Sequence, residues 1–201
     1  MKYLILWTLF THGAQDGMQD GILLTVDTIN PEFYESPEHR VCPVIDTRLE
    51  KSGCWTHVPD VLICYDGPVG ENRMRSAMRY WERLGYQFGT VSQAARDNQN
   101  CVMNNVPYGT IMVDIPSQTF QFGRHLGTTR VWRSNAARGL CEPAIFKAKI
   151  EIIPAWGDSE RILEHEIGHA LGWNDINETG HIMNGTWSNG GHSSRGLRNA
   201  Q

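Results

Sequence analysis

One short stretch in the last quarter of the 201-residue chain constrains the fold most strongly, because it carries two histidines at helical spacing. His165 and His169 are four positions apart, which places both imidazoles on one face of an α-helix, a single turn from each other. Two imidazoles in this arrangement can bind one Zn²⁺ ion, and Glu166 can reach a water molecule at the ion without binding the metal itself. The stretch therefore predicts a helix that carries two metal ligands and a general base.

A third metal ligand has to come from beyond this helix. If the helix continued, Asp175 would lie about 15 Å from His165 along the axis, too far to share one ion. Gly172 stands where a left-handed residue can end a helix without strain, so the chain is expected to turn back there. The turn favours Asp175 as the third ligand, through a carboxylate oxygen. His181 is the alternative, either at the metal in place of Asp175 or beside the following turn.

These residues resemble the signature of the metzincin metallopeptidases, which is H-E-x-x-H-x-x-G-x-x-H followed by a methionine-containing turn. Asp175 stands where most metzincins have histidine, and in this it is similar to the snapalysin-like proteases. The spacing between the helix and the methionine looks like that of the matrixins. The matching positions are His165, Glu166, His169, Gly172 and Met183.

The resemblance implies an α+β, metzincin-like zincin fold. Such a fold has a twisted, mostly parallel sheet with an antiparallel edge strand, a packing helix and a zinc-binding active-site helix. It also implies that Met183 packs beneath the metal and that residues 184–187 form a wall of the substrate pocket. An extended peptide could add to the edge strand, for which residues 128–135 and 140–147 are both candidates.

The function expected from the site is that of a zinc-dependent endopeptidase, in which His165, His169 and Asp175 bind Zn²⁺ and Glu166 is the general base. Two alternatives use the same residues. One is a zinc amidase that acts on cell-wall peptides, and the other is a non-catalytic binding module that zinc stabilises. The expected partner is a peptide or protein substrate, and the chain is expected to act as a monomer.

Composition and charge narrow the remaining possibilities. A formal net charge of −4 and a pI of about 6.0 argue against a nucleic-acid-binding protein, which would usually carry a basic face. Residues 1–14 have a positive start and a short apolar run, which predicts a signal peptide and a secreted protein, with a buried strand as the alternative. The run is too short to span a membrane. Residues 15–58 are predicted to be an N-terminal extension or propeptide-like segment, and residues 59–201 the catalytic domain.

Residue patterns predict most of the regular elements of that domain. Strands are expected at residues 61–65, 109–115, 128–132 and 144–153, and a helix at residues 71–85. Asp158 or Ser159 is expected to cap the start of the metal helix. The apolar side of the metal helix should face the sheet; its residues are Leu163, Ile167, Ala170 and Leu171.

The five cysteines and the last residues complete the expectations. Cys64 lies in an apolar run and is interpreted as a buried free thiol. Disulfides are then possible between Cys42 and Cys54 and between Cys101 and Cys141, as export would permit. The glycine-rich residues 188–201 are predicted to be mobile.

Overall fold

The computed structural model describes residues 51–65, 70–95, 98–102, 105–114, 125–134, 143–157 and 159–198. The expected signal peptide at residues 1–14 and most of the segment 15–58 lie outside these residues. Among the described residues, no helix has the length and apolar character needed to cross a membrane.

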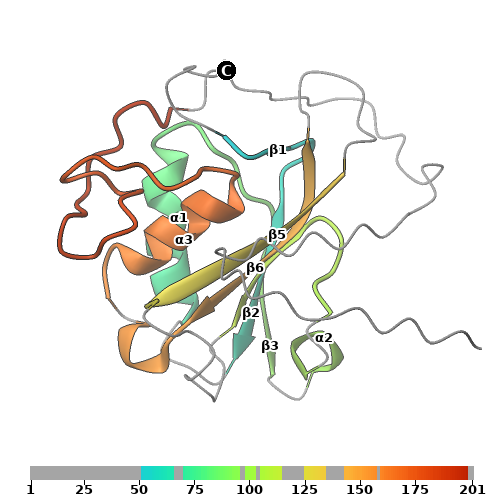
Figure 1. The fold of residues 1–201 in the computed structure, drawn as a ribbon. Helices are drawn as coiled ribbons and strands as arrows, with labels where there is room; N and C mark the ends of the chain where they lie inside the picture. The colour runs from blue at the N-terminus through green and yellow to red at the C-terminus, as the bar shows by residue number, and fades with distance from the viewer. Residues whose placement is uncertain are drawn as a thin grey trace, which may run out of the picture.

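The protein has an α+β fold built on a six-stranded, mostly parallel sheet (Figure 1). The strand order is β1-β6-β4-β2-β3, and β5 pairs with β6 as the antiparallel strand. This confirms the expected sheet and the strands predicted at four places in the chain. The bounds are Cys54–Trp55 for β1, Asp60–Tyr65 for β2, Val91–Ala95 for β3, Thr110–Asp114 for β4, Gly127–Ser134 for β5 and Ala144–Ile152 for β6.

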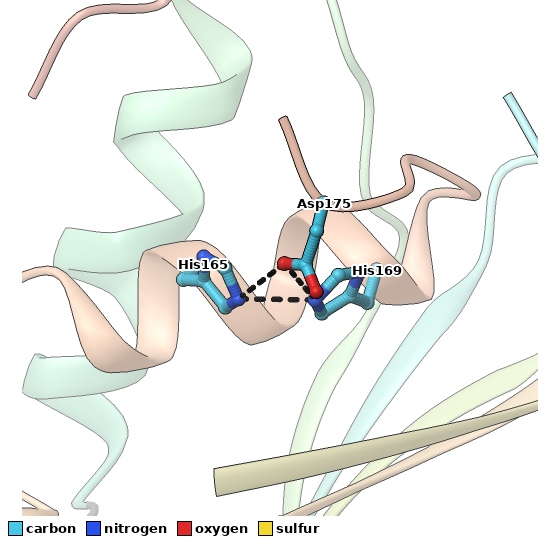
Figure 2. Close-up of side chains that lie close together, drawn as sticks. All are labelled: His165, His169 and Asp175. Carbon is cyan, nitrogen blue, oxygen red and sulfur yellow. Dashed lines mark hydrogen bonds and ion pairs between the residues drawn. The ribbon is translucent and has the colours of Figure 1, made fainter. Parts of the chain in front are cut away.

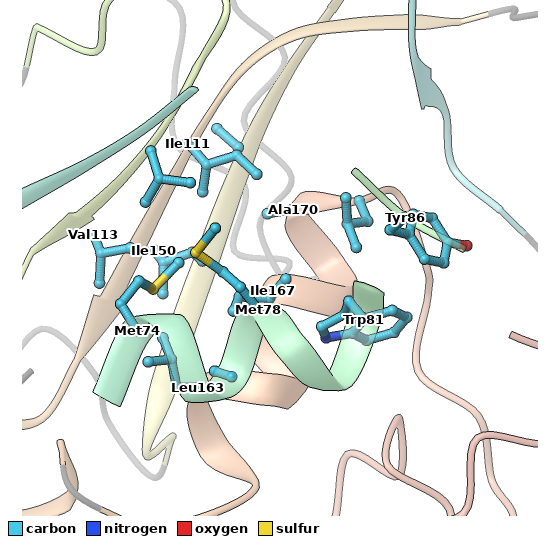
Figure 3. Packing of buried hydrophobic residues seen from close by; sticks show 14 of the residues in the cluster. Met74, Met78, Trp81, Tyr86, Ile111, Val113, Ile150, Leu163, Ile167 and Ala170 are labelled. Atoms are coloured by element: carbon cyan, nitrogen blue, oxygen red, sulfur yellow. The ribbon is translucent and has the colours of Figure 1, made fainter. Parts of the chain in front are cut away.

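Two helices pack on one face of the sheet (Figure 1). They are α1 (Glu71–Glu82) and α3 (Ile162–Ala170), and α3 is the predicted metal helix. The apolar side of α1 is buried against the sheet as predicted, and its turn closes at Gly85 with a φ of 91°. Figure 3 shows the apolar side of α3 in the same core, where Leu163, Ile167 and Ala170 are fully buried.

The strands β3 and β1 were not predicted. The residues of β3 are polar and mostly exposed, because among the described strands β3 pairs with β2 alone and lies at an edge of the sheet. An edge strand of this kind lacks the buried alternation by which strands are recognised. Residues 51–55 belong to the expected N-terminal segment, yet Trp55 is buried in the core and β1 pairs with β6. This part of the segment is therefore integral to the fold.

The cysteine predictions are corrected by a disulfide between Cys64 and Cys101. Cys64 is buried as expected, but on the face of the sheet away from α3, where the short helix α2 (Gln99–Val102) packs. This packing brings the two Cα atoms within 5.7 Å, so the free thiol at Cys64 and the Cys101–Cys141 pair are both wrong. Cys54 is also disulfide-bonded; its expected pairing with Cys42 lies outside the described residues.

The glycine-rich end of the chain is packed rather than mobile as far as the structure describes it. Leu197 is fully buried in the core, and the amide of Ile182 donates a hydrogen bond to the Ser193 carbonyl (2.8 Å). The Gly180 carbonyl accepts from the amide of Ser193 in turn (2.9 Å). The loop after the metal helix is therefore held by the segment that follows it.

Candidate metal centre

Three side chains from α3 and the turn after it converge on one point (Figure 2). The Nε2 atoms of His165 and His169 are 3.0 Å apart. The Oδ1 atom of Asp175 lies 3.4 Å from each of them. The structure thus brings together the three residues predicted as metal ligands, and their binding of zinc stays a prediction.

The spacing of these three atoms fits a tetrahedral zinc ion. Bonds of about 2.0–2.2 Å in tetrahedral geometry hold the ligand atoms about 3.3–3.6 Å apart. The two distances of 3.4 Å to Asp175 match this separation, and the 3.0 Å between the imidazoles is slightly shorter. Two neutral nitrogens and one carboxylate oxygen are also donors that zinc commonly takes. The residues present therefore fit the ion that the sequence predicts.

The other nitrogen of each imidazole fixes its tautomer. Nδ1 of His165 lies 2.8 Å from the Ile182 carbonyl oxygen, and Nδ1 of His169 lies 2.7 Å from the Trp173 carbonyl oxygen. A carbonyl can only accept, so each Nδ1 carries the proton and each Nε2 presents a lone pair. Two lone pairs and a carboxylate oxygen then face one another, an arrangement that a shared cation stabilises.

The protonation of the histidines follows from burial and neighbouring charge. Burial lowers the pKa of His165, and the adjacent His169 adds to this shift. Burial also acts to lower the pKa of His169, but the protonated ring can donate a hydrogen bond from Nε2 to Asp175, and this bond together with the charges of Glu166 and Asp175 outweighs burial and raises that pKa. The bond to His169 in turn holds the pKa of Asp175 low. A proton and a metal ion would therefore compete for the same lone pair, so acid would favour loss of a metal bound here.

His181 lies outside this cluster. It is fully buried, and its Nδ1 accepts a hydrogen bond from the amide of Met183 (3.0 Å). Its Nε2 therefore carries the proton, which it donates to the carbonyl of Arg195 (3.1 Å). Both ring nitrogens are thus used within the turn, and of the two candidates for the third ligand the structure places only Asp175 beside the histidines.

The turn that delivers Asp175 has the geometry expected from Gly172. That residue has a φ of 99°, its amide donates to the His169 carbonyl and the amide of Trp173 donates to the Gly168 carbonyl. These two bonds form a Schellman motif, which ends a helix by a left-handed residue. The carbonyl of Gly172 also accepts from both the amide and the hydroxyl of Ser52. The segment before β1 therefore locks the end of the metal helix.

The start of α3 differs from the prediction. Arg161 stands at the N-cap position with a φ of 81°, whereas Ser159 lies outside the helix and Asp158 is not among the described residues. The Glu164 carboxylate accepts from the amide of Arg161 (2.7 Å) and forms a two-pronged ion pair with Arg73 of α1 (2.8 and 2.6 Å). The helix is therefore capped by an acid in its own first turn, and the negative charge of this acid lies favourably at the positive end of the helix dipole.

Buried indole groups hold the metal helix at both ends. The N–H of Trp81 donates to the Glu164 carbonyl and that of Trp55 donates to the Ala170 carbonyl, both at 2.8 Å. The N–H of Trp173 donates to the Tyr86 hydroxyl (2.8 Å), and burial raises the pKa of Tyr86 well above its usual range. Because the Trp173 carbonyl orients His169, this network connects the core to the candidate metal site.

Replacement of Tyr86 by Phe is expected to destabilise the protein by about 1–3 kcal/mol, because the buried indole N–H of Trp173 loses its acceptor. Zinc affinity should fall by about tenfold as the orientation of His169 loosens. Thermal unfolding and competitive zinc titration measure the two effects. Tyr80→Phe is the matched control, since that hydroxyl is bonded to an exposed carbonyl, of His192. Equal effects of the two variants would contradict the proposed connection.

Glu166 lies between α3 and the edge strand β5. Its side chain is buried, and the Thr129 hydroxyl donates to its Oε2 atom (2.6 Å). A Cβ atom at Gly127 would come within 2.7 Å of its Oε1, so glycine leaves the space that the carboxylate occupies. The sequence analysis did not identify these two residues of β5, because a strand pattern does not show which of its residues will contact the helix.

Met183 packs against the helix that carries the candidate ligands; its expected position beneath a metal ion stays a prediction. It is fully buried, and a Cβ at Gly168 would come within 2.3 Å of its sulfur atom. Residues of the loop that follows, including Asn184, Gly185 and Trp187, line the cleft around the metal site, as was also expected.

The cleft has a volume of about 650 Å³ and runs along β5. Of the two stretches considered for the edge strand, residues 128–134 belong to β5, and residues 128–131 and 133 of it line the cleft. Residues 144–147 belong to β6 and lie inside the sheet. In the described part of the chain β5 pairs with β6 alone. No family model matches the sequence, and a search of curated proteins finds no significant match.

Proposed function

We propose that this protein is a zinc-dependent endopeptidase of metzincin type, with His165, His169 and Asp175 as zinc ligands. The observation that carries the proposal is the convergence of the two Nε2 lone pairs and one carboxylate oxygen, with both Nδ1 protons committed to backbone carbonyls. The antiparallel edge strand beside the cleft supports a peptide substrate. The disulfide between Cys64 and Cys101 supports an exported protein.

Glu166 is the residue proposed to move the proton. A zinc ion in such a site supplies Lewis-acid chemistry, by acidifying water and by stabilising negative charge on the scissile carbonyl oxygen. Glu166 follows the first histidine on α3, and its carboxylate is oriented by the hydroxyl of Thr129. It accepts the proton of the attacking water and then delivers it to the amine of the leaving fragment.

Strand β5 is proposed to orient the substrate. A peptide that pairs with the edge of β5 away from β6 uses backbone hydrogen bonds, which do not depend on its sequence. Thr129 and Gly127 of the same strand contact Glu166, so pairing places the peptide backbone beside the general base. The Asn184–Trp187 side of the cleft then meets the side chains next to the bond that is cleaved.

The proposal is tested by metal content and by hydrolysis of an unfolded protein, each measured on the same preparation. We expect one zinc per chain, cleavage at internal peptide bonds, loss of cleavage with a chelator and its return with zinc. Zinc without cleavage of any peptide or cell-wall substrate would support a non-catalytic module. Cleavage restricted to cell-wall peptides would support the amidase. Absence of stoichiometric zinc would overturn the proposal.

The third ligand is tested by a pair of variants. Asp175→Ala is expected to weaken zinc binding by more than about 100-fold, because a direct ligand is removed. His181→Ala should keep one zinc per chain while costing about 1–3 kcal/mol of stability, because it leaves the Met183 amide without its buried acceptor. Competitive zinc titration and thermal unfolding separate the two. Loss of zinc from the His181 variant alone would reverse the assignment.

A further inference from the structure

The charges that line the cleft are unbalanced. Its two carboxylates, Glu166 and Asp175, belong to the proposed catalytic site, and a divalent ion there offsets both. Three arginines remain in the lining, although the whole chain has a formal net charge of −4. None of them takes part in an ion pair among the described residues. They are Arg130, Arg133 and Arg161.

Arg133 lies on the face of β5 that faces the metal helix. The pairing of β5 with β6 shifts register between Trp132 and Arg133, so contacts rather than alternation along the strand place this side chain: Arg133 reaches Ser52, which is bonded to Gly172 at the end of α3. Its guanidinium donates one hydrogen bond, from an Nη atom to the hydroxyl of Ser52 (2.8 Å). Its Nε is buried with no hydrogen-bond partner. The guanidinium has further N–H groups on its Nη atoms, and a carboxylate that enters the cleft would accept from these.

Arg161 approaches the site from the other end of α3. It precedes His165 by four residues, which places it on the ligand side of the helix, one turn away. Its guanidinium lies 3.8 Å from the ring centroid of Trp187 and donates to the carbonyls of Trp187 and Gly190. These contacts hold the planar group in place and use two of its five N–H donors, so the others remain for a ligand.

The backbone of Arg161 gives a second reason to assign it a binding role. Its φ of 81° is the one positive value found at a described residue other than glycine. Strained backbone of this kind persists where the surrounding structure enforces it, and it concentrates at binding and catalytic sites. A glycine would adopt the same backbone without strain, so the arginine side chain itself has to account for the strain.

The two arginines flank the metal site along the cleft. Gly172, at the far end of α3 from Arg161, is bonded to Ser52, which accepts a hydrogen bond from Arg133. Along β5, Arg133 is four residues from Thr129, which corresponds to about 13 Å. A paired peptide would therefore meet Arg161 close to the cleaved bond and Arg133 about four residues away from it.

We propose that the cleft selects peptides with acidic side chains, and that Arg133 and Arg161 are the two residues that determine this selectivity. An aspartate or glutamate of the peptide beside Arg161 would form charge-assisted hydrogen bonds with that guanidinium. A second acidic residue, about four positions further along the peptide, would do the same with Arg133. This inference rests on the proposed peptidase function for the position of the peptide, but it concerns binding and can be tested without turnover.

The test uses matched peptides that carry glutamate, glutamine or lysine at the two positions. Their affinities are measured by fluorescence anisotropy with zinc-loaded Glu166→Gln protein, which is expected to bind without cleaving. We expect the glutamate peptide to bind about tenfold tighter than the glutamine peptide for each arginine engaged. The preference should weaken as salt is raised.

Variants separate selectivity from folding. Arg133→Gln and Arg161→Gln should each remove about tenfold of the preference for glutamate, whereas a merely structural role would weaken both peptides equally. Arg161→Gly removes the side chain at a backbone position that suits glycine, so it should stay folded and lose the same preference. Arg79→Gln removes an equal charge from the exposed side of α1 and should leave the preference unchanged. Arg133→Glu should reverse the preference towards lysine.

Two outcomes would overturn the inference: equal affinity for the glutamate and glutamine peptides, or a preference that survives in both glutamine variants. Cleavage of unfolded protein by the parent chain is measured in parallel. Glutamate-selective binding without cleavage would leave the inference standing and reject the peptidase. Cleavage with no charge preference would reject the inference and leave the peptidase.

Discussion

Replacement of Glu166 by Gln is expected to lower kcat/KM for peptide hydrolysis by about 10²–10⁴-fold while one zinc per chain is retained. The amide keeps the shape of the side chain and can still contact the Thr129 hydroxyl, which in the parent protein donates to the carboxylate at 2.6 Å. It cannot accept the proton of the attacking water, so the loss should fall mainly on kcat. Steady-state kinetics and metal analysis of the same samples measure both.

Glu178→Gln is the control for this experiment. Glu178 lies on the loop after α3, where it forms an exposed ion pair with Arg195 (3.5 Å), and it is not part of the cleft lining. Its replacement should leave both the rate and the zinc content unchanged. If Glu166→Gln retained activity within threefold of the parent, the role of general base would have to be given to another group.

Replacement of Gly172 by Ala is expected to destabilise the protein by about 3 kcal/mol, from a left-handed backbone and a steric clash together. The residue has a φ of 99°, and an added Cβ would lie 2.0 Å from the Gly53 carbonyl oxygen. Both partners are backbone, so no side chain can move aside. The shift should also displace Asp175 and lower zinc affinity. Denaturant unfolding with and without zinc measures both effects.

Gly180→Ala is the matched control for Gly172→Ala. Gly180 has a similar φ of 82°, but nothing lies within 4 Å of an added Cβ. Its replacement should cost about 1 kcal/mol, from backbone conformation alone. Equal losses in the two variants would mean that the contact with Gly53 contributes nothing and that the turn can shift without cost.

The candidate ligands could be found in the sequence because they are close together along the chain. His165, His169, Gly172 and Asp175 all lie in one helix and the turn that ends it, and local geometry alone brings them together. The helix ends at Ala170 and turns at Gly172, as the spacing indicates. The strands with alternating or continuous apolar residues could be predicted for the same reason, because each pattern lies within one short segment of the chain.

The residues that orient the site could not be found in this way. Trp55, Tyr86 and Thr129 come from three distant parts of the chain, and their contacts with the helix or the turn after it depend on how the sheet is assembled. A tryptophan in an apolar pattern indicates a core position but not the carbonyl to which its N–H will donate. The disulfide partner of Cys64 was missed because pairing depends on which face of the sheet each cysteine reaches.

The contact between Ser52 and the carbonyl of Gly172 sets a limit on how the chain could be shortened by proteolysis. A cut before Lys51 keeps in the chain the residues that make this contact, together with β1 and the indole of Trp55. A cut a few residues later would release the end of the metal helix, together with the turn that carries Asp175. A processing event that preserves this anchor of the candidate metal site therefore has to stop before Ser52.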